Sequence, residues 1–153
     1  MAGGGVTHRA ACSCGDLTVT VQGAPNFQAV CSCTDCQERT GSAFGMSVYY
    51  DHAQVLEKTG NPTRYRRVSN RDRALDFMFC PICGVTVWWE AEFFPQGIGI
   101  AGILLGPGFE FEPKFAVWAQ SLPDFAHYTN PALPVYSKGS SDGPPTRADG
   151  GPP

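Results

Sequence analysis

Apolar and polar residues alternate over short stretches of this chain, which is the period of a strand with one buried face. The sequence Leu-Thr-Val-Thr-Val at 17–21 is a clear case, and strong turn signals such as Gly60-Asn61-Pro62 separate such stretches. We predict strands at 17–21, 27–30, 43–50, 55–59, 64–68, 74–79, 85–89, 98–105 and 115–119. No window keeps a helical period over three turns, and residues 37–41 suit one helical turn or a loop. The pattern therefore predicts an all-β fold of short antiparallel sheets.

The two ends of the chain differ in composition from the part between them. Residues 1–10 are small and Gly-rich, so we predict a flexible N-terminus. From 138 to 153 the chain is Gly, Pro, Ser and charge with almost nothing apolar, which predicts a disordered tail. The remaining residues, 11–137, are enough for one domain with its own core.

Charge and hydropathy exclude several classes of protein. The formal net charge is −3 and the pI is about 5.5, which argues against a nucleic-acid partner, since binding phosphates requires a basic surface. Residues 1–11 have no apolar run typical of a secretory signal, and no stretch is long enough to span a membrane. We therefore expect a cytoplasmic, reducing setting, where clustered thiols are metal ligands rather than disulfides.

The seven cysteines fall into three clusters of two, three and two. The two pairs, Cys12 with Cys14 and Cys80 with Cys83, can together close one tetrahedral site, and four thiolates favour zinc. Each pair is followed by a glycine that eases the chain out of a tight turn. A redox dithiol at Cys80 and Cys83 is the alternative, but the alternating βαβ pattern it needs is missing.

The triplet Cys31, Cys33 and Cys36 leaves one coordination position to explain. The fourth ligand is His52, His8, His127, an acidic residue such as Asp35, water or a substrate. If a side chain closes this site, it is structural. If the position is open, zinc acts there as a Lewis acid and as an anchor for a thiolate, and we predict that the triplet is catalytic through its metal. Three thiolate charges lower Lewis acidity and favour sulfur chemistry, and only His52 and Asp35 are candidates for a general base.

Together these clusters resemble the glutathione-dependent formaldehyde-activating enzyme family, also called Gfa or centromere-protein-V-type. The matching motifs are Cys12-Ser-Cys14-Gly15, Cys31-Ser-Cys33-Thr-Asp-Cys36 followed by Gly41, Phe79-Cys80-Pro-Ile-Cys83-Gly84, and Phe115-Ala-Val-Trp118-Ala. The resemblance runs from about residue 11 to about residue 136. It implies an Mss4-like β fold with two zinc ions per chain. The implied structural zinc lies on Cys12, Cys14, Cys80 and Cys83, and the implied catalytic-type zinc on Cys31, Cys33 and Cys36.

The resemblance also implies carbon–sulfur lyase chemistry, the reversible joining of glutathione to formaldehyde as S-(hydroxymethyl)glutathione. Our hypothesis is a zinc-dependent lyase acting on a glutathione-type thiol adduct or a small carbonyl compound. Its expected partner is a small molecule, either glutathione or one of its adducts. We expect no nucleic-acid partner and no membrane partner, and the sequence leaves open whether the chain forms a homodimer. The alternative is a non-enzymatic zinc-binding module that binds a protein partner or glutathione.

Two further groups of residues have two interpretations each. Five arginines of one predicted hairpin either grip a substrate carboxylate or guard an exposed sheet edge, and we favour the edge. They are Arg64, Arg66, Arg67, Arg71 and Arg73. Five aromatic residues either wall a pocket or form the core, and we favour the core. They are Trp88, Trp89, Phe93, Phe94 and Trp118.

Overall fold

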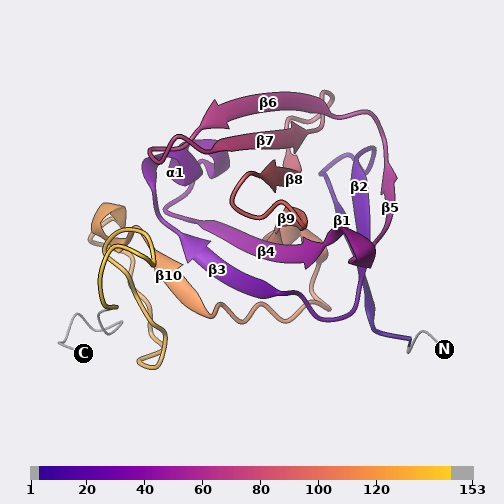
Figure 1. Cartoon of the computed structure of the whole chain (residues 1–153). Coiled ribbons are helices and arrows are strands. Elements are labelled where there is room, and N and C mark those ends of the chain that lie inside the picture. The colour runs from indigo at the N-terminus through magenta and orange to yellow at the C-terminus, as the bar shows by residue number, and fades with distance from the viewer. Residues whose placement is uncertain (1–3, 146–153) are drawn as a thin grey trace. The chain divides into compact units, whose positions relative to one another are not determined.

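A computed structural model describes residues 4–145 (Figure 1). The protein is nearly all-β, with 38% of residues in strands and 12% in helices, and it has the Mss4-like fold that the sequence predicts. The chain forms two compact units. Unit 1 comprises Met1–Asn26 and Val48–Glu110, and unit 2 comprises Phe27–Ser47 and Phe111–Pro153.

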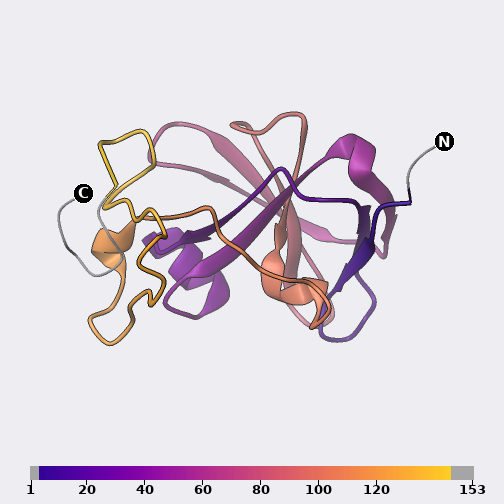
Figure 2. The same ribbon diagram turned by 90° about the horizontal axis from the view of Figure 1, so that it is seen from below.

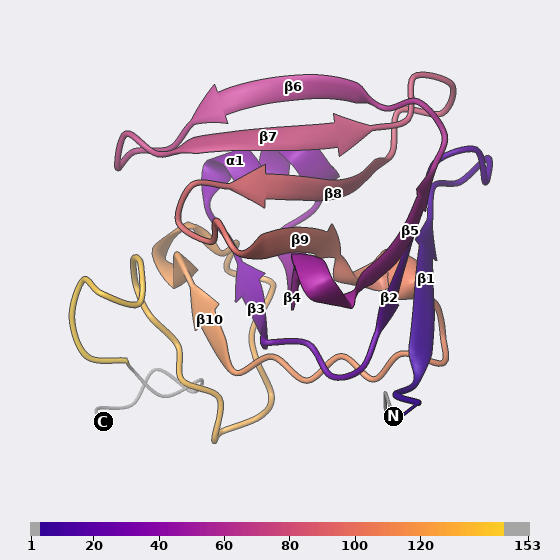
Figure 3. The same ribbon diagram turned by 45° about the vertical axis from the view of Figure 1, so that its right-hand side comes forward.

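Unit 1 contains a three-stranded antiparallel sheet in the order β1-β2-β5 (Figure 3). Its strands are β1 (Thr7–Ala11), β2 (Thr18–Gln22) and β5 (Val55–Thr59). A hydrogen bond of 2.6 Å joins the hydroxyls of Thr18 and Thr59 across the β2–β5 pair. Residues 7–10, which the sequence assigned to a flexible N-terminus, form most of β1 because their backbone pairs with β2.

Unit 1 also contains the strands β9, β8, β7 and β6 in that order, beginning beside the second half of β4 (Figure 1). Their bounds, in chain order, are β4 Gly45–Asp51, β6 Thr63–Val68, β7 Ala74–Phe79, β8 Thr86–Ala91 and β9 Gly97–Ala101. Between β4 and β5 the chain makes a 3-10 turn, η1 (His52–Gln54).

The strand predicted over 98–105 is shorter than expected. Strand β9 ends at Ala101, and a 3-10 turn, η2 (Gly102–Leu105), follows it. Both elements bury apolar side chains, Ile100 in β9 and Leu105 in η2. The continuous apolar sequence therefore predicts that these residues are buried, but it does not show where the strand gives way to a 3-10 turn.

The aromatic residues of unit 1 pack mainly in its core. Trp88, Trp89 and Phe94 are buried, whereas Phe93 is 43% exposed. The Trp89 indole N–H donates a 3.2 Å hydrogen bond to the Tyr49 hydroxyl. Trp89 faces Gly99 across the β8–β9 pair, where any Cβ would collide with the indole ring. The preferred interpretation of these aromatics as core is confirmed for the three buried ones.

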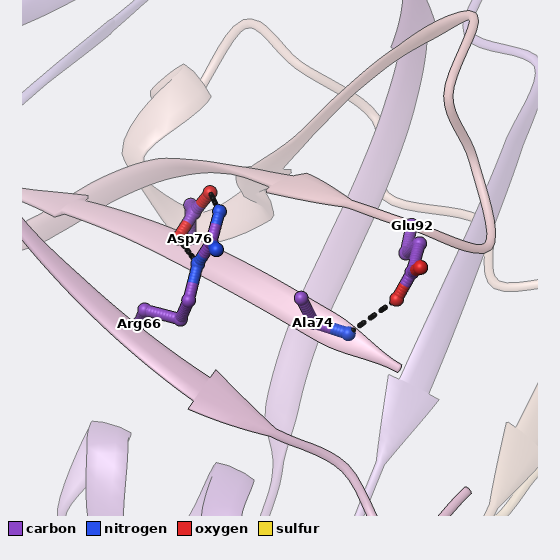
Figure 4. A network of polar contacts seen from close by, with 4 residues as sticks. All are labelled: Arg66, Ala74, Asp76 and Glu92. Atoms are coloured by element: carbon purple, nitrogen blue, oxygen red, sulfur yellow. Dashed lines mark hydrogen bonds and ion pairs between the residues drawn. The ribbon is translucent and has the colours of Figure 1, made fainter. Parts of the chain in front are cut away.

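The predicted arginine hairpin is the β6–β7 pair, and β6 ends the strand order. Arg66 lies opposite Asp76, and its Nε and Nη2 each donate a 2.7 Å hydrogen bond to the Asp76 carboxylate (Figure 4). Arg67 packs over the Phe77 ring at 5.3 Å. Because Arg66 already binds a carboxylate of its own chain, the edge interpretation of these arginines is the better one.

Unit 2 is built on β3 (Phe27–Cys31), with β10 (Phe115–Val117) on one side and the first half of β4 on the other. The β3–β10 pair is parallel, an exception to the antiparallel pairing that the sequence predicts. Strand β10 ends two residues earlier than predicted, because Trp118 adopts a left-handed φ of 59° and a 3-10 turn, η3 (Ala119–Ser121), follows.

The single α-helix of residues 4–145, α1 (Thr34–Thr40), lies in unit 2, where the sequence suggested one turn or a loop. Cys33 is its N-cap, and it ends at Gly41, whose φ of 62° favours glycine. Over residues 4–145 no helix is long and apolar enough to cross a membrane.

After η3 the chain runs through loops that contain no further named strand up to residue 145 (Figure 2). These loops contribute Leu133 and Val135 to a cluster with Val30 and Ala116, the core of unit 2. The Trp118 N–H donates a 2.9 Å hydrogen bond to the carbonyl of Lys138, where the predicted tail begins. Residues 146–153 lie outside the described residues, so the disordered tail and the domain bounds of 11–137 stay predictions.

Candidate metal centres

The first candidate centre unites two loops of unit 1. Cys12 and Cys14 follow β1, while Cys80 and Cys83 follow β7, and their four sulfur atoms all lie within 4.8 Å of one another. The Sγ of Cys14 is 3.6 Å from the Sγ of Cys12 and 3.6 Å from the Sγ of Cys80. Four sulfur atoms bound to one zinc ion at about 2.3 Å stand about 3.8 Å apart at the corners of a tetrahedron. The spacing therefore fits a four-thiolate zinc site.

Both loops are folded by the same backbone contacts. The N–H of Cys12 donates to the carbonyl of Leu17, and the N–H of Cys80 to that of Val85, each at 3.0 Å. The glycine after each pair, Gly15 or Gly84, has a φ near 80° and donates back to the first cysteine's carbonyl. The glycines that the sequence singled out thus close two matching turns that present the thiols.

Backbone donors favour the thiolate form at this centre. The Leu17 N–H donates a 3.2 Å hydrogen bond to the Cys12 sulfur. The Val85 N–H, followed in importance by that of Cys14, lowers the pKa of Cys83 to about 6 by hydrogen bonding to its sulfur. Because zinc binds the thiolate rather than the thiol, these contacts prepare the site for metal.

The second candidate centre lies in unit 2, where β3 leads into α1. Cys31 is the last residue of β3, Cys33 caps α1 and Cys36 is in its first turn, and the three sulfur atoms lie within 4.8 Å of one another. The Cys36 N–H donates a 3.4 Å hydrogen bond to the Cys33 sulfur. The three thiols of this centre thus come from one short stretch of the sequence, as their spacing predicts.

Of the three thiols in the triplet, that of Cys36 has the lowest pKa. Hydrogen bonds from the Cys31 and Cys33 thiols, with a further contribution from the Arg39 guanidinium, lower the pKa of Cys36 to about 3. Gly45 leaves room for this guanidinium, since a Cβ at Gly45 would stand 2.8 Å from Arg39 Nη2 and 3.8 Å from the Cys36 sulfur. A positive charge is therefore held against the thiolate cluster.

The predicted fourth-ligand candidates are distributed over both units. Neither Asp35 nor His127, both in unit 2, brings a ligand atom into the triplet's group. His52 begins η1 in unit 1, and the His8 ring packs edge-on against Phe109 there at a centroid distance of 5.0 Å. Within the described part of unit 2, the triplet is a three-ligand set.

Sequence reasoning missed two hydroxyl groups beside the triplet. The hydroxyl of Ser32, a fully buried residue between Cys31 and Cys33, lies 3.2 Å from the Tyr128 hydroxyl. Burial raises the pKa of Tyr128, and the nearby charge of Cys31 also raises it, so the phenol stays protonated. Tyr128 lies in a loop region without strand or helix pattern, so no local signal marks it.

The fold and the clusters define a small all-β protein with one four-cysteine and one three-cysteine candidate metal centre. A family profile described as glutathione-dependent formaldehyde-activating enzyme matches residues 7–121, and the chain belongs to this family. A crystal structure of a Rhodobacter sphaeroides protein is similar in fold, with a TM-score of 0.51 and 18% identity over 67% of this chain and 90% of that one. A search of curated proteins gives no match. The family resemblance of the cysteine motifs is confirmed.

Proposed function

We propose that this protein is a zinc-dependent carbon–sulfur lyase that joins a glutathione-type thiol to a small carbonyl compound and reverses that reaction. Formation of S-(hydroxymethyl)glutathione is the family's reaction. The observation that supports the proposal is the division of the thiols into a set of four and a set of three. A complete tetrahedral set is typical of structural zinc, and a three-ligand set is typical of zinc with an exchangeable position.

The two centres have different roles in this proposal. Cys12, Cys14, Cys80 and Cys83 hold a structural zinc that ties the loop after β1 to the loop after β7. The triplet of Cys31, Cys33 and Cys36 holds a second zinc, which when bound supplies Lewis acidity and a coordination position for a thiolate or an oxygen.

The residues around the triplet supply positioning and proton contacts. Addition of a thiol to a carbonyl compound forms one C–S bond and moves the thiol proton to the oxygen, with no change of oxidation state. Our candidate for the donor of a proton to that oxygen is Tyr128, whose hydroxyl stays protonated and lies 3.2 Å from that of Ser32. Arg39 balances thiolate charge at Cys36, which limits the loss of Lewis acidity that three thiolates cause.

The test is the exchange rate between glutathione and S-(hydroxymethyl)glutathione, measured by ¹³C exchange NMR with labelled formaldehyde. We expect the zinc-loaded full chain to raise this rate, and Cys33→Ala to abolish the increase while the protein stays folded. Elemental analysis should give two zinc ions per chain. A protein that binds glutathione but leaves the rate at its spontaneous value would instead be the non-enzymatic module, and one zinc per chain would refute the two-centre scheme.

A further inference from the structure

Strand β6 is the last strand in the order of its sheet (Figures 1 and 3). Within residues 4–145, β7 is the only strand that pairs with it, in a register that runs from Thr63↔Phe79 to Val68↔Ala74. Every residue of β6 except Arg67 is exposed. The strand therefore presents one edge without a partner strand, and such an edge is a template for pairing with another extended chain.

The hairpin of β6 and β7 has a charge opposite to that of the whole chain. Residues 63–79 contain five arginines and two aspartates, a formal charge of +3 in a chain whose net charge is −3. Asp76 binds Arg66, but Arg64 lies opposite Met78 rather than a carboxylate. This edge therefore attracts anionic partners.

A second copy of β6 is a poor partner for this edge. In an antiparallel pair of two β6 strands centred on Tyr65, Arg64 of one copy stands opposite Arg66 of the other. In a pair centred on Arg66 or Arg67, that arginine stands opposite itself. Like charges directly opposite each other destabilise a sheet. The arginines thus keep copies of this chain from pairing here, but they favour a strand that carries negative charge.

The alternation of side chains along β6 defines the partner more closely. Successive side chains of a strand point to opposite faces, so Arg64 and Arg66 share one face and Tyr65 lies on the other. Tyr65 is 59% exposed, so its ring offers apolar surface to a neighbour. A partner strand with acidic residues at alternate positions places its carboxylates beside the arginines and its intervening apolar side chains beside Tyr65.

We propose that the outer edge of β6 binds an extended segment of a protein partner, in which acidic residues alternate with apolar ones, as an added strand of the sheet. Backbone hydrogen bonds supply affinity in this mode of binding, and side-chain pairs supply specificity. A nucleic acid could pair with the arginines but has no peptide backbone to add to the sheet. The inference uses neither cysteine centre, so it does not depend on the proposed function.

The first experiment titrates a synthetic peptide of alternating glutamate and valine into the zinc-loaded full chain and follows backbone amides by NMR. We expect saturable shifts over Thr63–Val68 and slower hydrogen exchange at alternate amides of the strand, those that point away from β7. The same peptide N-methylated at successive central residues keeps its charge but loses N–H donors, and it should not bind. Equal binding of the two peptides, or no saturable shift with the first, would overturn the proposal.

The second experiment tests the charge of the edge. Arg64→Glu turns an attraction into a repulsion at one cross-strand pair, so it should weaken peptide binding about tenfold. The matched control Arg9→Glu makes the same charge change at an exposed residue of β1, in the other sheet of unit 1, and should bind the peptide like the unaltered chain. Equal weakening in both variants would show that net charge alone attracts the peptide, and would overturn the assignment to β6.

Two further probes test the alternative occupants. A single-stranded oligothymidylate that shifts the same amides and binds as tightly as the peptide would overturn the proposal. Shifts of the β6 amides that grow with protein concentration, in the absence of peptide, would show pairing between copies and would also overturn it. If Arg64→Glu does not fold, the two peptides on the unaltered chain still decide the matter.

Discussion

The Sγ of Cys14 lies 3.6 Å from the Sγ of Cys80, so a loop after the first strand meets a loop in the middle of the chain. One metal ion bound by both sulfur atoms is sufficient to explain why these two loops lie so close together. The four-cysteine centre then acts as a cross-link whose removal frees two distant parts of unit 1.

We therefore expect Cys83→Ala and Cys33→Ala to differ sharply in stability. A structural zinc contributes about 10–16 kcal/mol of apparent binding free energy, comparable with or above the whole stability of a small domain. Cys83→Ala should lose its cooperative thermal transition in circular dichroism, whereas Cys33→Ala should keep it and lose only one zinc. Equal melting temperatures for the two variants would contradict the division of roles.

Gly45→Ala should weaken metal binding at the triplet without touching a ligand. The added methyl group would stand 2.8 Å from Arg39 Nη2 and push the guanidinium away from the Cys36 sulfur. Loss of such a second-sphere contact typically lowers metal affinity 10- to 100-fold, so a competition assay with a zinc indicator should give about a tenfold weaker site. The control is Gly108→Ala, where a Cβ meets nothing within 4 Å. The same loss of affinity in both variants would rule out this role for Arg39.

Tyr128→Phe should cost stability as well as lyase activity. The change leaves the buried Ser32 hydroxyl without its 3.2 Å partner, and an unsatisfied buried hydroxyl costs about 1–3 kcal/mol. Urea unfolding followed by fluorescence would measure the loss. Tyr136→Phe is the matched control, since the Tyr136 ring packs edge-on against Phe115 and the ring is retained. An unchanged midpoint in Tyr128→Phe would mean that the hydroxyl pair contributes nothing to folding.

The sequence predicts those parts of the molecule whose conformation is determined by residues close to them in the chain. The strands at Val55–Thr59 and Ala74–Phe79 have the predicted bounds, because turn residues mark their ends. The triplet is also local, since Cys31, Cys33 and Cys36 can meet through one strand end and one helical turn. Spacing alone is therefore sufficient to find it.

Features that depend on distant partners were missed or only partly predicted. Strand β1 has no clear alternation and exists because its backbone pairs with β2. The parallel β3–β10 pair depends on a connection that no local pattern reports. Tyr128 reaches Ser32 only through the packing of unit 2, so this hydroxyl pair could be found only in the structure.

Tyr50 predicts a specific dependence of stability on alkaline pH. It is fully buried, its hydroxyl makes no hydrogen bond within residues 4–145, and burial raises its pKa to about 12. An unfolded tyrosine ionises near pH 10, so the stabilising effect of the protonated phenol is complete below about pH 10 and is lost as the pH rises towards 12. Tyr50→Phe removes both the titration and an unsatisfied hydroxyl.

We expect the Tyr50→Phe variant to be at least as stable as the unaltered chain at pH 8 and to lose less stability between pH 10 and 12 in urea unfolding. The exposed Tyr65→Phe should keep the alkaline loss of the unaltered chain, and an identical loss in Tyr50→Phe would show that another group causes it.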